Sequence, residues 1–287
     1  MVRDDFAIFI LSHGRPNEQY TIKYLLSHNY TGKWYIIIDN EDDTAPEYFK
    51  LWGDHVVQFD RLAQWNRHDF DIGDNFTANR NSVVFARNMC WEIAKNLGLN
   101  YFFEFEDDYT DFTMRFDVNG SCHQWYVNDF DAICECFIKY MEETPNLTTV
   151  CMSQVGDWLG GIKGDMYKKK IKRKAMNTFM CKVDRPFYFL GRMNDDVNTY
   201  VTEGSRGKVF LTVKDLIMRQ QETQKTSSGN TEMYKQLGTY VKSFYSVMMA
   251  PSSVKIAMMG QSHRRIHHSI DWEVAVPKIV SDKFKVK

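Results

Sequence analysis

Three successive acids end an aromatic run near the middle of the chain, in "YFFEFEDDYTDF" at residues 101–112. The run has the composition of a buried strand, and Glu106, Asp107 and Asp108 stand at its carboxyl end. Carboxylate oxygens suit hard divalent cations such as Mg²⁺ or Mn²⁺, and such a cation stabilises the charge on a departing nucleoside diphosphate. The same triplet, taken alone, is also explained as a solvated acidic turn, and the buried strand before it is what favours a site.

Polar side chains also follow the first two predicted strands, "FAIFIL" at 6–11 and "WYIII" at 34–38. The two loops carry Ser12, His13, Arg15, Asp39 and Asn40. In mononucleotide-binding α/β folds an acid at such a position accepts hydrogen bonds from a ribose or base, and an arginine can reach a phosphate. Asp and Asn also favour turns for backbone reasons, so neither loop is diagnostic by itself.

A second acidic pair occurs in "NDDVNTYVTEG", where Asp195 or Asp196 could act as a general base on an acceptor hydroxyl. An ordinary helix start is the alternative, because Asn and Asp are common there. The tail segment "GQSHRRIHHSI" adds His263, Arg264 and His267. Imidazole can complete a carboxylate metal site and arginine can clamp phosphate, although a solvated basic segment would look the same.

A glycine- and lysine-rich stretch follows "VGDWLGG". Lys168, Lys169 and Lys170 could grip a phosphate backbone, since lysine gives affinity that does not depend on base sequence. Trp158 could stack on a sugar or an extruded base, and Asp157 is a second candidate base. Most charge runs are plain solvated faces, so this stretch leaves both interpretations open.

Alternating strands and helices must position these groups. Helices are predicted near 17–26, 47–51 and 128–141 and from 194 onwards, and further strands are predicted at 55–60, 101–106, 148–156 and 179–191. The clearest helix lies within 81–100, with Asn81 or Ser82 as its cap and Gly98 just past its end. This order predicts an α/β fold with a mostly parallel sheet whose carboxyl edge binds ligands.

The overall composition sets limits on function. The chain has 287 residues and a formal net charge of −1, so any polyanion contact must come from a local patch. Its six cysteines form no paired CxxC framework, no apolar run has the length of a membrane span, and no signal peptide precedes the first strand. We therefore expect a reduced, cytoplasmic protein with no membrane contact.

The order of the clusters resembles that of the GT-A glycosyltransferases. In that family an arginine-bearing loop follows strand one, as at 12–16 here, and an acid-bearing loop follows strand two, as in "IIIDNEDDT". A helix with an Ala-Arg-Asn signature, here residues 86–88, leads into a metal-binding DxD strand, matched by "YFFEFEDD". Two departures stand out: Glu106 replaces the first Asp of that motif, and Asp195 stands where the family commonly has Glu.

The resemblance implies a role for each matched residue. The base would be Asp196, with Asp195 beside it. A divalent cation, Mn²⁺ or Mg²⁺, would be held by Glu106, Asp108, His263 and His267. A UDP-sugar would contact Ser12, His13, Arg15, Asp39, Asn40, Arg87, Asp107 and Arg264. The acceptor would contact Asp157, Trp158, Lys168, Lys169, Lys170 and Arg192. Residues 1–120 would form the nucleotide-sugar half and 121–287 the acceptor half of one continuous domain.

More narrowly, the chain looks like the TET-associated glycosyltransferases of bacteriophages, on its size, the "LSHGRP" opening, the "FEFEDDY" site and the basic tail. That likeness implies a hydroxymethylated pyrimidine in DNA as the acceptor. Two alternatives remain at this stage. One is a GT-A enzyme acting on a glycan, lipid or protein hydroxyl. The other is a metal-dependent nuclease or a nucleic-acid-binding protein that uses the same acids and lysines.

Overall fold

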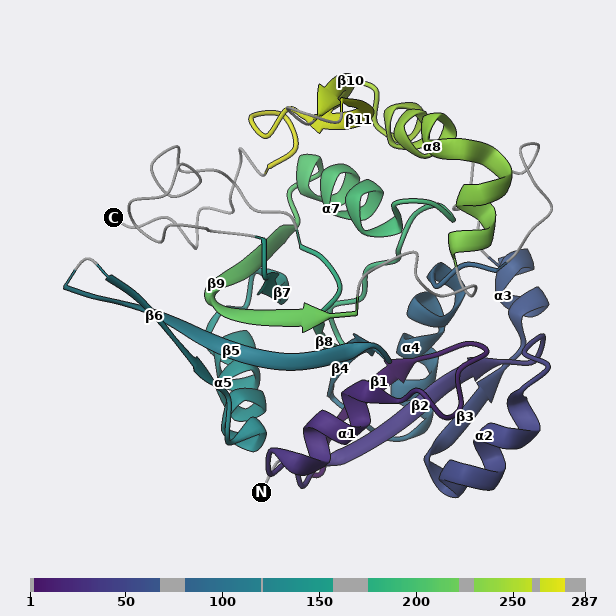
Figure 1. Ribbon diagram of the computed structural model, residues 1–287, viewed down its shortest axis with the longest axis vertical. Coiled ribbons are helices and arrows are strands. Elements are labelled where there is room, and N and C mark those ends of the chain that lie inside the picture. Colours follow the sequence, from purple (N-terminus) through teal and green to yellow (C-terminus); the bar gives the residue numbers. More distant parts are fainter. Residues whose placement is uncertain are drawn as a thin grey trace.

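The computed structural model describes residues 3–67, 81–119, 121–156, 175–221, 230–259 and 264–276. Its centre is a nine-stranded sheet in the order β3-β2-β1-β4-β8-β7-β9-β5-β6 (Figure 1). Of these strands only β8 and β5 run against the other seven, because β4 and β7 both pair antiparallel with β8, and β9 and β6 both pair antiparallel with β5. The predicted α/β class and mostly parallel sheet are confirmed.

The first half of the chain builds the fully parallel part of the sheet. Its strands are β1 (Phe6–Leu11), β2 (Lys33–Asp39), β3 (Val56–Phe59) and β4 (Tyr101–Glu106). Its helices are α1 (Tyr20–Ser27), α2 (Ala45–Trp52), α3 (Arg61–Arg67) and α4 (Val84–Asn96), with a 3₁₀ turn at Gly53–His55. All of β1 is buried, which explains why it reads as an unbroken apolar run instead of an alternating one.

The rest of the sheet is more mixed and was only partly predicted. Its strands are β5 (Tyr109–Val118), β6 (Ser121–Tyr126), β7 (Leu147–Gln154), β8 (Phe179–Lys182) and β9 (Val209–Gln220). Its helices are α5 (Phe130–Glu143) and α7 (Asp195–Ser205). The predicted strands at 179–191 shrink to β8, because the chain turns directly after it, with the N–H of Arg185 donating to the carbonyl of Lys182 at 2.8 Å. Although β5 belongs to the first half of the chain, it pairs with β9 of the second half.

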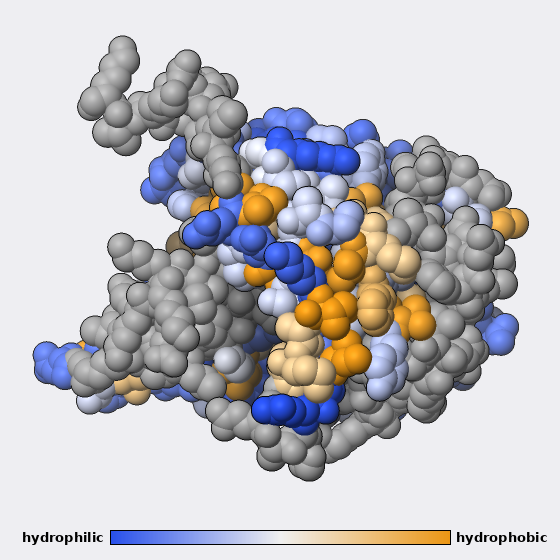
Figure 2. Space-filling view, turned by 90° about the horizontal axis from the view of Figure 1, so that it is seen from above, coloured by the Kyte–Doolittle hydropathy of each residue, from blue (hydrophilic) through white to orange (hydrophobic). Residues whose placement is uncertain are grey.

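A cap lies over α7 in Figure 1. It consists of α8 (Asn230–Met249) and a two-stranded ribbon of β10 (Val254–Met259) and β11 (Arg265–Ile270). Figure 2 views the molecule from this side and shows apolar and hydrophilic side chains intermixed on it; Phe244, Met248 and Met258 are among the exposed apolar ones. No helix in the described ranges is both long enough and apolar enough to cross a bilayer.

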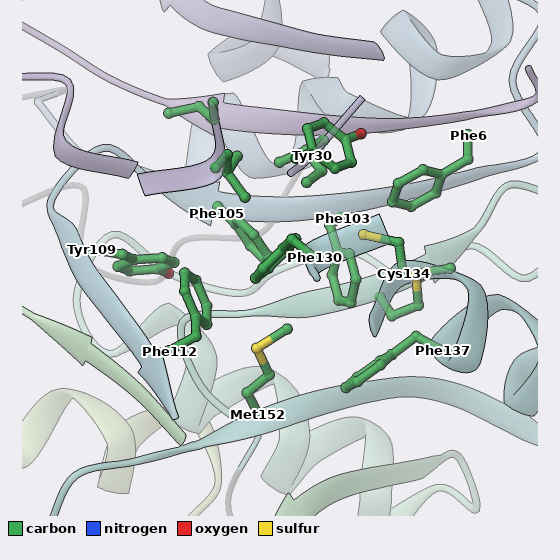
Figure 3. Close-up of a cluster of buried hydrophobic side chains, with 14 of the residues drawn as sticks. Phe6, Tyr30, Phe103, Phe105, Tyr109, Phe112, Phe130, Cys134, Phe137 and Met152 are labelled. Carbon is green, nitrogen blue, oxygen red and sulfur yellow. The ribbon is translucent and has the colours of Figure 1, made fainter. Parts of the chain in front are cut away.

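Strand β4 shows how the sheet separates packing from chemistry. Its side chains alternate between the two faces, so Phe103 and Phe105 enter the aromatic core beneath α1 and α5 (Figure 3). The other face carries Phe102, Glu104 and Glu106 towards α4 and α7. The aromatic cluster therefore anchors the strand on one side, while its carboxylates are presented on the other.

Helix α4 ends as predicted but begins differently. Gly98 lies just past its end with φ at +68°, a conformation that costs glycine little. Ser82 does not cap the start. Its Oγ instead donates to the carbonyl of Arg192 at 2.8 Å, and so ties the helix entry to the segment that leads into α7.

Candidate active site

The polar loops meet at one edge of the sheet, where β1, β2, β3, β4, β7 and β9 all end. This follows from their common direction, and it brings residues far apart in the sequence to one rim. The backbone N–H of Gln221, just after β9, donates to the carbonyl of Asp108 at 3.1 Å. The acidic turn after β4 is thus joined directly to the second half of the sheet.

Asp107 faces the loop after β1. Its carboxylate accepts a hydrogen bond from Ser12 Oγ at 2.5 Å and pairs with Arg15 Nη2 at 2.7 Å. Complete burial raises the pKa of Asp107 to about 6, although Arg15 and Ser12 act in the opposite direction. The Tyr48 hydroxyl lies 2.6 Å from Ser12 Oγ and accepts the N–H of Arg15 at 2.9 Å. Asp107 therefore fixes the shape of this loop.

Arg87 joins the two acidic clusters. Its Nη2 lies 2.8 Å from Glu106 Oε1 and its Nη1 3.4 Å from Asp195 Oδ2. The guanidinium is only 3% exposed and sits 5.1 Å from the ring centre of Phe179 and 5.0 Å from that of Phe189. Helix α4 thereby holds the end of β4 against the start of α7.

The buried acids around Arg87 resist ionisation. Burial raises the pKa of Asp195 to about 7 despite the nearby guanidinium, and it raises the pKa of Glu106, to which the charge of Asp108 adds. Glu104 lies two residues before Glu106 on the same face of β4. Burial raises its pKa well above the ordinary value.

The surroundings of Glu106 and Asp108 disfavour two negative charges, which a bound divalent cation would neutralise. Burial, with the neighbouring charge of Asp107, raises the pKa of Asp108 to about 6. No hydrogen-bond donor among the described residues reaches the buried Oδ1 of Asp108. Two carboxylates that disfavour each other's charge, one with an unused oxygen, form a donor set that a hard cation would stabilise.

Of the predicted histidine ligands, His267 is not assembled with these acids. Within the described ranges, no three His, Cys, Asp or Glu side chains come together as a metal-binding group. His267 lies in β11, and its Nδ1 accepts the backbone N–H of His268 at 2.9 Å. His263 lies outside the described residues. Arg264 lies just before β11 and is exposed.

The loop after β2 is held by a residue that the sequence reasoning did not single out. Asp39 pairs with Arg61 and, at 3.0 Å, with His13 Nδ1. Burial opposes ionisation of Asp39, but His13 and Arg61 outweigh it and lower its pKa. Asn40 accepts the backbone N–H of Arg61 at 3.0 Å. Arg61 comes directly after the predicted strand in "HVVQFDR". A position just after a strand is also what identified Asp39, so the same criterion could have identified Arg61.

On the opposite side, Asp195 and Asp196 open α7 but differ in access. Asp195 is buried against Arg87, whereas Asp196 is half-exposed and accepts the backbone N–H of Val197 at 2.7 Å. Arg192 is buried, with its guanidinium 4.9 Å from the ring centre of Trp65. The other predicted acceptor contacts lie outside the described residues; these are Asp157, Trp158, Lys168, Lys169 and Lys170.

A cavity of 290 Å³ opens at the carboxyl ends of β7 and β9. It is lined by Gln154, Val155, Gly156, Met218, Arg219 and Gln220. Gln220 is followed by Gln221, whose N–H binds the Asp108 carbonyl, so the cavity adjoins the acidic turn. Its walls are mainly apolar, and Gln154, Arg219 and Gln220 supply the longer polar side chains beside Asp108.

A family model described as TET-Associated Glycosyltransferase matches residues 6–229. No curated protein matches the chain. Solved structures with a similar chain course include a mycobacterial protein, with 9% identity, a TM-score of 0.48 and coverage of 93% of this chain and 84% of the other. Glucosyl-3-phosphoglycerate synthase from Mycobacterium tuberculosis also appears. Its complex with UDP has 7% identity, a TM-score of 0.48 and coverage of 91% and 86%. Its complex with phosphoglyceric acid has a TM-score of 0.49 at the same identity and coverage.

Proposed function

Since the chain belongs to the TET-associated glycosyltransferase family, we propose that it moves a sugar from a UDP-sugar to the hydroxyl of a hydroxymethylated pyrimidine in DNA. The observation that carries this proposal is the Arg87 bridge. Through this bridge Glu106, the acid on the donor side, lies close to Asp195 and so to the acceptor-side pair Asp195 and Asp196, at the ligand edge of the sheet.

The donor nucleotide would lie over the ends of β1 and β2. His13, Asp39 and Arg61 form a network of fixed charge there that can recognise a ribose or base. Arg15 is one-quarter exposed while it pairs with Asp107, so it can offer further N–H groups to a phosphate without leaving its partner.

Glu106 and Asp108 would hold a divalent cation against the donor diphosphate, with His263 as the further ligand. When bound, the cation supplies positive charge to the leaving diphosphate. Arg87 of α4 holds Glu106 in place through an ion pair. Asp107 pairs with Arg15 of the loop after β1, and this contact fixes the turn between β4 and β5. These contacts orient the two acids before a ligand arrives, which limits the cost of reorganisation.

Asp196 would act as the base. It is the accessible member of the pair, while Asp195 is committed to Arg87. The acceptor oxygen forms a bond to the anomeric carbon as the bond from that carbon to the diphosphate breaks, and the acceptor proton passes to Asp196. This geometry favours inversion. In a retaining reaction Asp196 would orient the acceptor hydroxyl instead.

A base within a duplex would have to leave the stack to reach Asp196, which costs a few kcal/mol. Trp158 and the lysine run at 168–170 are the residues we assign to offset that cost, by stacking and by contacts to the phosphate backbone. The description of the family as TET-associated is what supports a nucleic-acid acceptor.

The test is incubation of the protein with hydroxymethylated or unmodified DNA, a panel of UDP-sugars and Mn²⁺, followed by nucleoside mass spectrometry. A hexose- or pentose-sized increment on the hydroxymethylated nucleoside only would support the proposal. Asp196→Asn should remove the increment, while Asp117→Asn, in an exposed part of β5, should keep it. Transfer to a glycan, lipid or protein hydroxyl with none to DNA would contradict the acceptor assignment and leave a glycosyltransferase of another specificity.

A further inference from the structure

The cavity at the carboxyl ends of β7 and β9 is formed by residues other than those assigned to the donor. Val155 and Met218 give it apolar walls, and Arg219 and Gln220 bring polar groups to it. Its volume of 290 Å³ lies near the lower end of the range of about 300–1,000 Å³ that is typical of small-molecule sites. A space of this size suits a single ring better than a whole nucleotide-sugar.

The side chain of Gln220 is held in one orientation. Its Oε1 accepts a hydrogen bond from Asn177 Nδ2. The buried Asn177, whose backbone is left-handed with φ at +65°, is fixed in turn by the Tyr109 hydroxyl, which donates to its carbonyl at 2.7 Å. Tyr109 also pairs with Gln220 between β5 and β9. With its oxygen engaged, Gln220 has its two amide N–H groups to offer a ligand in the cavity.

Arg219 adds further donors and no acceptor. Its Nε lies 3.4 Å from Asp111 Oδ2, and its side chain is 49% exposed. The guanidinium has N–H groups beyond that contact. None of the described residues that line the cavity carries a carboxylate. The cavity therefore favours a ligand edge that accepts hydrogen bonds.

We propose that this cavity holds the pyrimidine ring of the acceptor and that Gln220 and Arg219 favour cytosine over uracil. This inference rests on the proposed function and adds the identity of the modified base. An extruded base is recognised through its Watson–Crick edge. On cytosine that edge places two acceptors, O2 and N3, side by side, whereas uracil has a donor, N3–H, between its two carbonyl groups. Donors at Gln220 and Arg219 match the first arrangement and leave the N3–H of uracil facing another N–H.

A base fits this cavity better than the transferred sugar does. The side chains of Val155 and Met218 can pack against the faces of a flat ring, while the hydroxyl groups of a sugar would lose water there without gaining partners. The backbone N–H of Gln221 donates to the carbonyl of Asp108 at 3.1 Å, so the cavity adjoins the proposed cation site. A hydroxymethyl group on a ring in the cavity would then lie near the sugar that the cation-bound diphosphate carries.

The first experiment uses two single-stranded oligonucleotides that differ only in carrying hydroxymethylcytosine or hydroxymethyluracil. Wild-type protein should show a kcat/KM roughly tenfold higher for hydroxymethylcytosine, which corresponds to about one hydrogen bond. Gln220→Glu keeps an acceptor for Asn177 but replaces the donor by a second acceptor, so it should reverse the preference. Gln124→Glu is the matched control, since Gln124 is exposed on β6, and it should keep the wild-type ratio. Because each ratio is taken within one protein, partial unfolding does not alter it.

A further variant tests whether the base occupies the cavity. Gly156 lines it, and a Cβ added there meets no heavy atom within 4 Å, so a side chain at this position takes up cavity space instead of displacing a neighbour. Gly156→Val should raise the KM for the hydroxymethylcytosine oligonucleotide roughly tenfold, as expected when a pocket loses room for a bound group. The affinity for UDP, measured by calorimetry, should change less than twofold. Thermal melting verifies that the variant folds.

The outcomes separate this inference from the proposed function. Transfer by wild type with an equal or lower kcat/KM for hydroxymethylcytosine, or a ratio that Gln220→Glu leaves unchanged, would overturn the inference alone. A raised KM for the UDP-sugar in Gly156→Val, with an unchanged KM for the oligonucleotide, would also overturn it, because the cavity would then hold the sugar. No product from wild type on either oligonucleotide would overturn the acceptor assignment and the inference with it.

Discussion

The two sides of the active edge are built in different ways. On the donor side, charged groups are paired with partners from neighbouring loops, as in Asp39 with Arg61 and Asp107 with Arg15. On the acceptor side, Asp196 interacts electrostatically with Lys242 of α8, which follows it by tens of residues. The first side is fixed by contacts between neighbouring loops, whereas the second depends on contacts with the cap. Arg87 is the joint between them.

The largest effect should follow from removing the Arg87 guanidinium, which pairs with Glu106 and Asp195. Arg87→Met leaves Glu106 and Asp195 buried without their cation, which should cost about 3–5 kcal/mol of unfolding free energy. Chemical denaturation measures the loss. Adding Asp195→Asn should recover part of it, because one uncompensated acid is removed. A variant as stable as wild type would show that the two sides are not joined through this residue.

Asp196→Asn should act on the acceptor side alone. Loss of a general base costs about 100-fold or more in kcat, while UDP binding should persist because the donor network is untouched. Rapid-quench assays with saturating donor give kcat, and calorimetry gives the UDP affinity. Equal losses from Asp195→Asn would contradict the division of roles based on burial.

Asp108→Asn should act on the donor side through the cation. If Glu106 and Asp108 bind Mn²⁺, the metal-dependent part of UDP binding should fall roughly tenfold or more, in line with the strength of contacts to charged groups. Calorimetric titration of UDP with Mn²⁺ and with EDTA measures it. UDP binding by wild type that EDTA leaves unchanged would argue against a cation site.

Arg61→Met should give the smallest change. It removes one of the two charged-side-chain partners of Asp39, and we expect a several-fold rise in the KM for UDP-sugar with kcat nearly kept, because His13 and the backbone N–H of Glu41 still hold the carboxylate. Steady-state kinetics with varied donor measures it. A larger effect on the KM for the acceptor than on that for the UDP-sugar would contradict the assignment of Asp39 and Arg61 to the donor nucleotide.

The sequence was most informative about candidate site residues that stand at the carboxyl end of a strand. Asp39, Glu106 and Asp108 come immediately after apolar runs, and the direction of a parallel sheet then places them at its ligand edge. The end of α4 at Gly98 followed from glycine conformation in the same way.

Other features depend on contacts that no local pattern records. The pairing of β5 with β9, the burial of Arg87 between two phenylalanines, and the approach of Lys242 to Asp196 all join distant segments. Strand β6 was missed because all six of its residues are exposed, so it shows no buried alternation.

The course of the chain from β4 to β5 bears on how such enzymes diversify. Only Asp107 and Asp108 separate these strands in sequence, yet β8, β7 and β9 lie between them in the sheet. A cut near residue 120 would remove β5 from the sheet of the second half. The two halves therefore cannot be exchanged between relatives like separate modules. New acceptor specificities are more accessible through replacement of peripheral segments, such as the cap, on an undivided sheet.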